Sequence, residues 1–248
     1  MNEFTLLITS AVRPTGRKVA LNDESQRKHL TLLAIEKWLQ IDTSLKIVIC
    51  DGSDYDFSHE VKNLYPNALI ECLHFKNSSE KVALFGKGYG EGEITNYALD
   101  NSTFLKNSEN FAKCTSKLWV RNFNTITKHW NGKIQVEGVF KNIFRFKTIQ
   151  KMHIETKFYL ANKYFYKQYL SESYKDVNEI RGLSLEHCFS NSLDATELHY
   201  YMFNHPLLIN GYSGSSGEYL HKNIYHYLKN AAEIQILKCR TNYIFQPL

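Results

Sequence analysis

The hydrophobic positions in the first third of the chain form three short runs, each with the length and composition of a buried β-strand. They cover residues 4–10, 45–50 and 68–75. Between the first two runs, apolar residues recur at helical spacing over residues 25–40, which predicts an amphipathic helix. Strands that alternate with helices are typical of a parallel, doubly wound sheet. The pattern therefore predicts an α/β fold with a Rossmann-like, mostly parallel central sheet flanked by helices.

The rest of the chain shows weaker patterns. Residues 117–122 and 134–140 indicate further strands, and the aromatic stretch 156–170 is expected to become helical towards its end. Residues 215–228 are expected to start with small residues at a helix N-terminus and to continue as the last helix. No internal repeat, biased segment or linker interrupts the chain, so we expect a single domain over residues 1–248.

Charge adds a preference for anionic partners. The chain carries 30 lysine and arginine residues against 25 acidic residues, a net charge of +5. This balance favours a nucleotide diphosphate, an anionic membrane surface or nucleic acid. The basic residues are spread along the sequence without a run of five, which argues against a nucleic-acid-binding tail.

Cysteine usage and the N-terminal sequence bear on the compartment. The five cysteines are widely spaced and lack a Cys-x-x-Cys pair, so we expect reduced thiols rather than disulfides or a zinc site. The first residues lack the basic segment and the apolar length of a signal sequence, and no apolar run is long enough to span a membrane. We therefore expect a cytoplasmic protein.

Asp51 is the first candidate for a binding residue because it directly follows the second predicted strand. Open α/β sheets bind ligands at the carboxyl ends of their strands, where a carboxylate can accept hydrogen bonds from a ribose or a base. The alternative is a simple Asp-Gly-Ser turn. The nearby Asp54 and Asp56 have the spacing of a divalent-metal and diphosphate site. They lie early in the chain for that role, and a solvated acidic turn is the preferred interpretation.

A glycine-rich stretch, residues 86–92, precedes a helix expected over residues 93–99. Gly88 and Gly90 would let the backbone approach a nucleotide donor closely, and Glu91 adds a carboxylate. The stretch does not match a phosphate-binding P-loop, because Gly-Lys is followed by glycine rather than by serine or threonine. A flexible loop without a ligand is the alternative.

Glu186 and His187 form a polar pair in an otherwise apolar stretch, residues 182–189. Burial raises the pKa of a carboxyl group, and such a group can serve as a general base. A structural glutamate at a helix start explains Glu186 equally well. Ser215 and Ser216 present a similar choice, because small residues at a helix N-terminus suit a phosphate and the same segment also matches a capping box.

Together these segments resemble GT-A type glycosyltransferases that build bacterial capsule, O-antigen or lipopolysaccharide sugars. The segments that carry the resemblance are Ile8-Thr-Ser10, Cys50-Asp-Gly-Ser53, Gly88-Tyr-Gly-Glu91, residues 111–117, Glu155-Thr-Lys-Phe158 and Leu185-Glu-His187. The resemblance implies transfer of a sugar from a nucleotide-diphosphate donor. It also implies that Asp51 contacts the nucleotide and that Glu186 is the catalytic carboxylate.

One departure from that family concerns the diphosphate. Residues 101–130 contain no Asp-x-Asp, so Lys113, Lys117 or Arg121 would neutralise the diphosphate instead. We expect an enzyme without a tightly held metal, with magnesium or manganese as the open alternative. The resemblance further implies a glycan or lipid-linked glycan acceptor and peripheral association with the inner face of the membrane, which positive charge favours.

Two other functions compete with this hypothesis. In an S-adenosylmethionine-dependent methyltransferase the glycine-rich stretch would bind the cofactor, but it comes too late in the chain for that role. In a basic nucleic-acid-binding protein, bases would stack on tyrosine or phenylalanine. We expect no nucleic-acid partner, because the sequence shows no obvious cluster of basic and aromatic residues.

Overall fold

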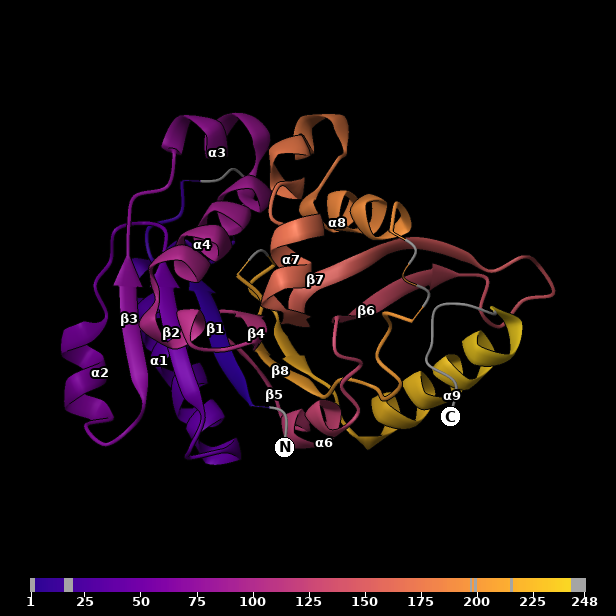
Figure 1. The fold of residues 1–248 in the computed structure, drawn as a ribbon, viewed down its shortest axis with the longest axis horizontal. Coiled ribbons are helices and arrows are strands. Elements are labelled where there is room, and N and C mark those ends of the chain that lie inside the picture. Colours follow the sequence, from indigo (N-terminus) through magenta and orange to yellow (C-terminus); the bar gives the residue numbers. More distant parts are fainter. Residues whose placement is uncertain (1–2, 16–19, 197, 199, 215, 242–248) are drawn as a thin grey trace.

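A six-stranded mixed sheet forms the centre of the computed structural model (Figure 1). Its strand order is β3-β2-β1-β4-β7-β6, with β1 to β4 parallel and β7 antiparallel to both of its neighbours. The strands are β1 (Phe4–Ser10), β2 (Lys46–Asp51), β3 (Ile70–His74), β4 (Asn110–Thr115), β6 (Ile134–Lys141) and β7 (Gln150–Asn162). The structure describes residues 3–15, 20–196, 198, 200–214 and 216–241.

Helices cover both faces of this sheet because the central strands are apolar on both faces. In β1, Leu6 and Ile8 join one hydrophobic cluster, and Leu7, between them, joins the other. The first cluster includes α1 (Glu24–Ile41), α2 (Ser58–Leu64) and α6 (Phe123–Lys128). The second includes α3 (Ser79–Phe85), α4 (Lys87–Asn101), α5 (Thr103–Lys106), α7 (Lys163–Tyr169), α8 (Leu185–Asp194) and α9 (Ile224–Arg240). Short 3₁₀ turns at Ser173–Asp176 and Glu179–Arg181 precede α8.

A smaller antiparallel sheet joins the region just after β4 to the C-terminal part of the chain. It consists of β5 (Leu118–Val120), β8 (Ile209–Tyr212) and β9 (Tyr219–His221), in the order β5-β8-β9. Because β5 directly follows the turn after β4, this sheet fixes the backbone at the carboxyl end of a central strand.

The predicted opening of the fold is confirmed. The first three strands and the first helix lie within a residue or two of the expected ranges, and the fold is an α/β fold with a mostly parallel sheet. The strand predicted at residues 134–140 is also present, and residues 156–170 do become helical towards their end, after β7. No helix in the described ranges is both long and apolar enough to cross a membrane.

Three expectations about secondary structure are wrong. The glycine-rich stretch does not form a loop: Gly88, Gly90 and Gly92 lie in the first half of α4. The helix expected over residues 215–228 starts later: residue 215 lies outside the described residues, Tyr219–His221 forms β9, and α9 starts at Ile224 after the capping side chain of Asn223. The strand predicted at residues 117–122 is only three residues long, and β4, immediately before it, was not foreseen.

Candidate functional site

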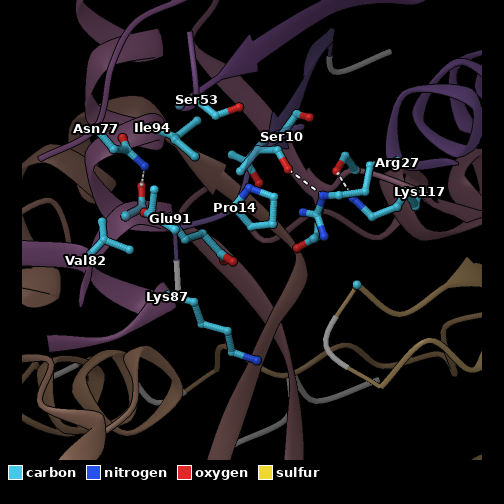
Figure 2. Close-up of a pocket in the computed structure, with 18 of the residues that line it drawn as sticks. Ser10, Pro14, Arg27, Ser53, Asn77, Val82, Lys87, Glu91, Ile94 and Lys117 are labelled. Carbon is cyan, nitrogen blue, oxygen red and sulfur yellow. Dashed lines mark hydrogen bonds between the residues drawn. The ribbon is translucent and has the colours of Figure 1, made fainter. Parts of the chain in front are cut away.

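A pocket of about 500 Å³ lies above the carboxyl ends of β1, β2 and β4 (Figure 2). The first turns of α4 and α8 and the segment after β8 supply other parts of its lining. Six of the lining side chains are basic, namely Arg13, Arg27, Lys76, Lys87, Lys117 and Lys157. Three are acidic, namely Asp54, Glu91 and Glu186. The position matches the edge at which open α/β sheets bind ligands, and the excess of cations favours an anionic ligand.

Two of these cations are buried and adjacent. Arg27 is 7% exposed and Lys117 is 2% exposed, and Figure 2 shows them side by side at one end of the pocket. Arg27 donates to the carbonyl oxygens of Ala11 and Leu21 at 2.6 and 2.7 Å, and Lys117 donates to Ser116 Oγ at 2.7 Å. Within the described residues neither cation forms an ion pair. Unpaired charge is costly to bury, so this end of the pocket is suited to an anion.

The environment of Lys117 changes its acidity. Burial, and secondarily the positive charge of Arg27, lower the pKa of Lys117 to about 7, while Asp51 acts in the opposite direction. Burial also lowers the pKa of Arg27. A lysine whose pKa lies near neutral pH and which faces a pocket is a common mark of a functional site.

The backbone at Lys117 is held in an uncommon conformation. Its φ angle is 74°, in the left-handed region that non-glycine residues rarely adopt. The amide of Tyr212 donates to the carbonyl oxygen of Lys117 at 3.0 Å. Strand β8 thus fixes the turn from which the Lys117 side chain reaches the pocket.

Polar atoms in the pocket lack partners among the described residues. The hydroxyl of Ser10 is fully buried at the end of β1, and no hydrogen bond engages it. The side-chain oxygen of Asn77 is likewise unpartnered, while its amide nitrogen donates to the carbonyl of Gly90 at 3.4 Å. Such atoms cost free energy unless a ligand or water binds them, so both are available to form hydrogen bonds with a ligand in the pocket.

Asp51 lies beneath the pocket and does not line it. Its side chain is fully buried, and its Oδ2 accepts the Val12 amide at 2.9 Å. Its Oδ1 accepts the Ser53 amide, the Ser53 hydroxyl and the Tyr55 amide at 2.8, 2.5 and 3.2 Å. These bonds tie the loop after β1 to the loop after β2. The expected direct contact between Asp51 and a nucleotide does not fit this geometry, because the carboxylate is enclosed by its own chain.

A second charged group lies along α4. Lys113 of β4 is fully buried, and its Nζ donates to Glu91 Oε1 at 2.5 Å, to Thr115 Oγ1 at 3.0 Å and to the Thr156 carbonyl at 2.9 Å. Lys113 therefore neutralises Glu91, which lines the pocket, and does not face the pocket itself. Figure 2 shows Glu91 together with Lys87, which lies in the first turn of the same helix.

Glu186 lies in the first turn of α8 and lines the pocket, as a site residue must, but its acidity differs from our expectation. Burial raises its pKa, but hydrogen bonds from Ser184 and from its own backbone amide, together with the charge of Lys87, outweigh burial, and the net pKa is below the ordinary value. Thr156 also donates to Glu186 Oε1 at 3.3 Å. Glu186 is therefore an ionised carboxylate at neutral pH.

The glycines of α4 serve close packing. A Cβ on Gly88 would lie 2.9 Å from Leu185 Cβ, so this residue lets α4 approach the start of α8. A Cβ on Gly90 would lie 2.8 Å from Asn77 Nδ2, and Gly90 lines the pocket. Of the two predicted donor-binding glycines, only Gly90 reaches the pocket. Because the stretch is helical, it also cannot be the cofactor loop on which the methyltransferase alternative depends.

The structure does not place the other predicted donor-binding residues, Arg121, Ser215 and Ser216, in the pocket lining. Arg121 is exposed at the end of β5 and does not line the pocket. Ser216 lies in an exposed turn rather than at a helix N-terminus, and Ser215 lies outside the described residues. The neighbours Ser213 and Gly214 do line the pocket, and a Cβ on Gly214 would lie 3.3 Å from Lys117 Cε.

The Asp54-Tyr55-Asp56 segment is not arranged as a metal site. Asp54 lines the pocket but pairs with His74 Nδ1 at 2.9 Å, and Asp56 accepts the Ser58 amide at 2.8 Å. Across the part of the chain that the structure describes, no three histidine, cysteine or acidic residues group as ligands for a metal ion.

Sequence reasoning missed Arg27 and Ser10. Arg27 occupies a position on the buried side of α1, in line with Leu30, Thr31, Ala34 and Trp38. An arginine on the apolar face of an amphipathic helix was the signal that could have identified it. Ser10 gave no such signal, because a serine at a strand end is common.

Comparison with known proteins supports the fold. No family model and no curated protein matches the sequence. The chain is similar to the inositol-1-phosphate CTP transferase from T. maritima, with 14% identity over 94% of this chain and 96% of that chain and a TM-score of 0.53. Weaker likenesses are to 4-diphosphocytidyl-2C-methyl-D-erythritol synthase (10% identity, 96% and 99% covered, TM-score 0.44) and to galactosyltransferase LgtC (9%, 77% and 70%, 0.46). The likeness to the CTP transferase shows that the chain has a nucleotidyltransferase-like α/β fold.

Proposed function

We propose that this protein transfers a sugar from a nucleotide-diphosphate donor to a hydroxyl of a bacterial surface glycan or lipid-linked glycan. The observation that carries the proposal is the pair of buried cations, Arg27 and Lys117, at the carboxyl edge of β1 and β4. A diphosphate would supply the negative charge that this end of the pocket lacks. The unpartnered Ser10 hydroxyl lines the same pocket and can donate a further hydrogen bond.

Glu186 is the proposed catalytic carboxylate. In an inverting transfer, the acceptor oxygen attacks the anomeric carbon while the bond from that carbon to the diphosphate oxygen breaks. The acceptor proton passes to Glu186, and the nucleoside diphosphate leaves with its new charge next to Lys117 and Arg27. Because Glu186 is ionised at neutral pH, it is ready to accept that proton.

Asp51 is proposed as a positioning residue rather than a contact. Its four accepted hydrogen bonds fix the loops after β1 and β2, and residues of both loops line the pocket. Loss of this carboxylate would disorganise the floor beneath the donor.

We propose that the two cations neutralise the diphosphate, the role that a divalent metal has in sugar transferases with an Asp-x-Asp site. The groups at this end of the pocket are an ammonium and a guanidinium, which bind phosphate oxygens and repel metal ions. Full turnover in the presence of a chelator is expected. Activity that a chelator abolishes and manganese or magnesium restores would contradict this part of the proposal.

Nucleotidyl transfer is a second candidate, favoured by the similarity to the CTP transferase over nearly the whole length of both chains. In that reaction a sugar phosphate would attack a nucleoside triphosphate and release pyrophosphate. The same cations would then hold the triphosphate.

Product analysis separates the two reactions. The protein is incubated with a panel of nucleotide sugars and glycan acceptors, and in parallel with nucleoside triphosphates and sugar phosphates. Release of a nucleoside diphosphate with sugar transfer supports the proposal, and release of pyrophosphate supports the second candidate. Lys117→Met should abolish whichever activity is found, whereas Arg121→Met, outside the pocket, should retain it. If neither nucleotide class binds or reacts, both candidates are wrong.

A further inference from the structure

The turn between β6 and β7 carries two exposed aromatic side chains. Phe146 is fully exposed, with a relative exposure of 109%, and Phe144 is 61% exposed. The hairpin extends to one end of the molecule, and the end of α9 lies beside it (Figure 1). Large apolar side chains at such a position have no partner within the described chain to cover them, and this arrangement is typical of an interaction surface.

The same turn is strongly basic. Residues 141–151 contain Lys141, Arg145, Lys147 and Lys151 and no acidic residue. Lys151 pairs with Asp194, whereas the other three are exposed. This segment is a cluster of basic and aromatic residues, so our expectation that the sequence lacks one is wrong. We call residues 141–148 the hairpin tip.

The hairpin tip is held in shape by the last helix. Arg240, at the end of α9, donates to the carbonyl oxygens of Ile143, Arg145 and Lys147 at 3.1, 3.0 and 2.8 Å. Asn142 Nδ2 also donates to the Thr148 carbonyl at 3.2 Å. None of these bonds uses a phenyl ring or a cation of the hairpin tip, so both kinds of side chain can contact a partner. A preformed surface loses less entropy on binding than a flexible one.

We propose that the hairpin tip docks on the surface of an anionic lipid bilayer. Exposed phenylalanine side chains can bury at the boundary between headgroups and acyl chains, and exposed lysine and arginine are attracted to anionic lipid headgroups. The small size of the hairpin tip favours lipid over a protein partner, because a stable protein interface uses about 20–30 residues on each side. Charge complementarity thus selects an anionic membrane as the occupant.

Docking at this surface would bring the pocket close to the membrane. Strand β7 runs from the hairpin tip to Thr156 and Lys157, which line the pocket. At roughly 3.3 Å per residue, the ten positions from Lys147 to Lys157 span at most about 33 Å. An acceptor attached to a lipid could reach across this distance, but the docking itself does not depend on which reaction the pocket performs.

Vesicle flotation tests the proposal with the full-length protein. Vesicles of phosphatidylcholine are compared with vesicles that also contain phosphatidylglycerol. We expect binding only to the anionic vesicles, and a decrease in binding as salt is raised. Phe144→Ser with Phe146→Ser should lower the partition coefficient about tenfold or more. Arg145→Gln with Lys147→Gln should lower it by about fivefold for each cation removed.

A matched control lies at the other end of the molecule, on α2 (Figure 1). Lys62→Gln with Leu64→Ser removes two exposed side chains as well, here one cation and one apolar residue, and its binding should equal that of the wild type. Circular dichroism and thermal unfolding confirm that each variant is folded. Absence of binding to anionic vesicles, or equal binding by the tip variants, would overturn the proposal. Self-association or oligonucleotide binding that the tip variants lose, without any vesicle binding, would assign the surface to a second copy or to nucleic acid and would also overturn it.

Discussion

A Cβ atom on Gly211 would lie 2.0 Å from the carbonyl oxygen of Lys117. The two residues are far apart in the sequence, but β8 pairs with β5 and brings them together. Gly211 also has a φ of 119°, a backbone conformation that residues other than glycine rarely adopt. The position of the proposed diphosphate-binding lysine therefore depends on a glycine in another strand.

Gly211→Ala should displace the turn that carries Lys117. We expect weaker nucleotide binding and a lower free energy of unfolding, by about 1–3 kcal/mol for the steric overlap. Gly132→Ala is the matched control, because Gly132 has a φ of 81° and nothing within 4 Å of its would-be Cβ. The control shares the backbone strain without the overlap, so it should lose stability while nucleotide affinity, measured by calorimetry, stays normal. Equal effects of the two changes on affinity would contradict the argument.

The depressed pKa of Lys117 predicts a pH-dependent affinity for a nucleotide diphosphate. Only the protonated lysine attracts the diphosphate, and its pKa is about 7 in the empty pocket. Affinity should therefore fall as the pH rises above 7, by about tenfold per pH unit at the steepest. Lys117→Met should bind weakly at every pH, and Arg121→Met should keep the wild-type profile. A wild-type affinity that does not change between pH 6 and pH 9 would be the contrary result.

The same pKa affects the stability of the protein without ligand. In the unfolded chain a lysine keeps its proton to a pH of about 10.4, whereas folded Lys117 loses it near pH 7. Between these two values the unfolded state binds more protons, so this residue makes the free energy of unfolding rise with pH, by up to about 1.4 kcal/mol per pH unit. Urea unfolding of the wild type and Lys117→Met, compared at each pH, isolates this contribution as their difference.

The ion pair between Lys113 and Glu91 should be important for stability. Lys113 is fully buried, so Lys113→Met leaves Glu91 without its neutralising partner, and Glu91→Gln leaves a buried ammonium. Each single change is expected to cost about 3–5 kcal/mol of unfolding free energy. The double variant should lose less than the sum of the two, because it leaves no unpaired charge. Additive losses in urea unfolding would show that the two residues act independently.

Glu186→Gln tests the proposed catalytic base. It preserves shape and removes the proton acceptor, so kcat should fall by about 10²–10⁴-fold while donor affinity changes little. Because the pKa of Glu186 is lowered, the acid limb of the wild-type rate profile should lie below the range of an ordinary glutamate. Glu80→Gln, which also removes an acidic residue from the first turn of a helix, is the control for a purely structural role. Near-normal turnover in folded Glu186→Gln would show that Glu186 is not the catalytic base.

The sequence predicted the buried half of the fold better than the site. Strands β1 and β2 are largely apolar, buried runs, and such runs can be recognised without tertiary contacts. The glycines of α4 were misread, because their helical packing against Leu185 and Asn77 depends on residues distant in the sequence. Lys117 was identified from the missing acidic pair, whereas its burial beside Arg27 became visible only in three dimensions.

Glu186 shows why acidity is harder to predict than position. Its apolar neighbours in the sequence correctly indicated partial burial, which alone would raise the pKa. The opposing hydrogen bonds arise because α8 begins at Leu185 and because Thr156 of β7 lies next to it. The hydrogen bond from Ser184 lowers the pKa most, followed by the backbone amide of Glu186, the charge of Lys87 and Thr156, and together these contributions reverse the sign of the shift. The local sequence does not reveal how the chain folds at this helix start, nor which residues of α4 and β7 lie beside it.

The pairing of β5 with β8 also sets an order of events during synthesis. A ribosome releases the chain from its N-terminus, so β1 to β4 and the turn at Lys117 are exposed long before residues 209–212 emerge. Until then, nothing fixes the carbonyl of Lys117, and the diphosphate-binding end of the pocket is unfinished. A nascent chain can therefore assemble most of its central sheet while it is still unable to bind a nucleotide. The appearance of nucleotide affinity would show that β8 has paired with β5.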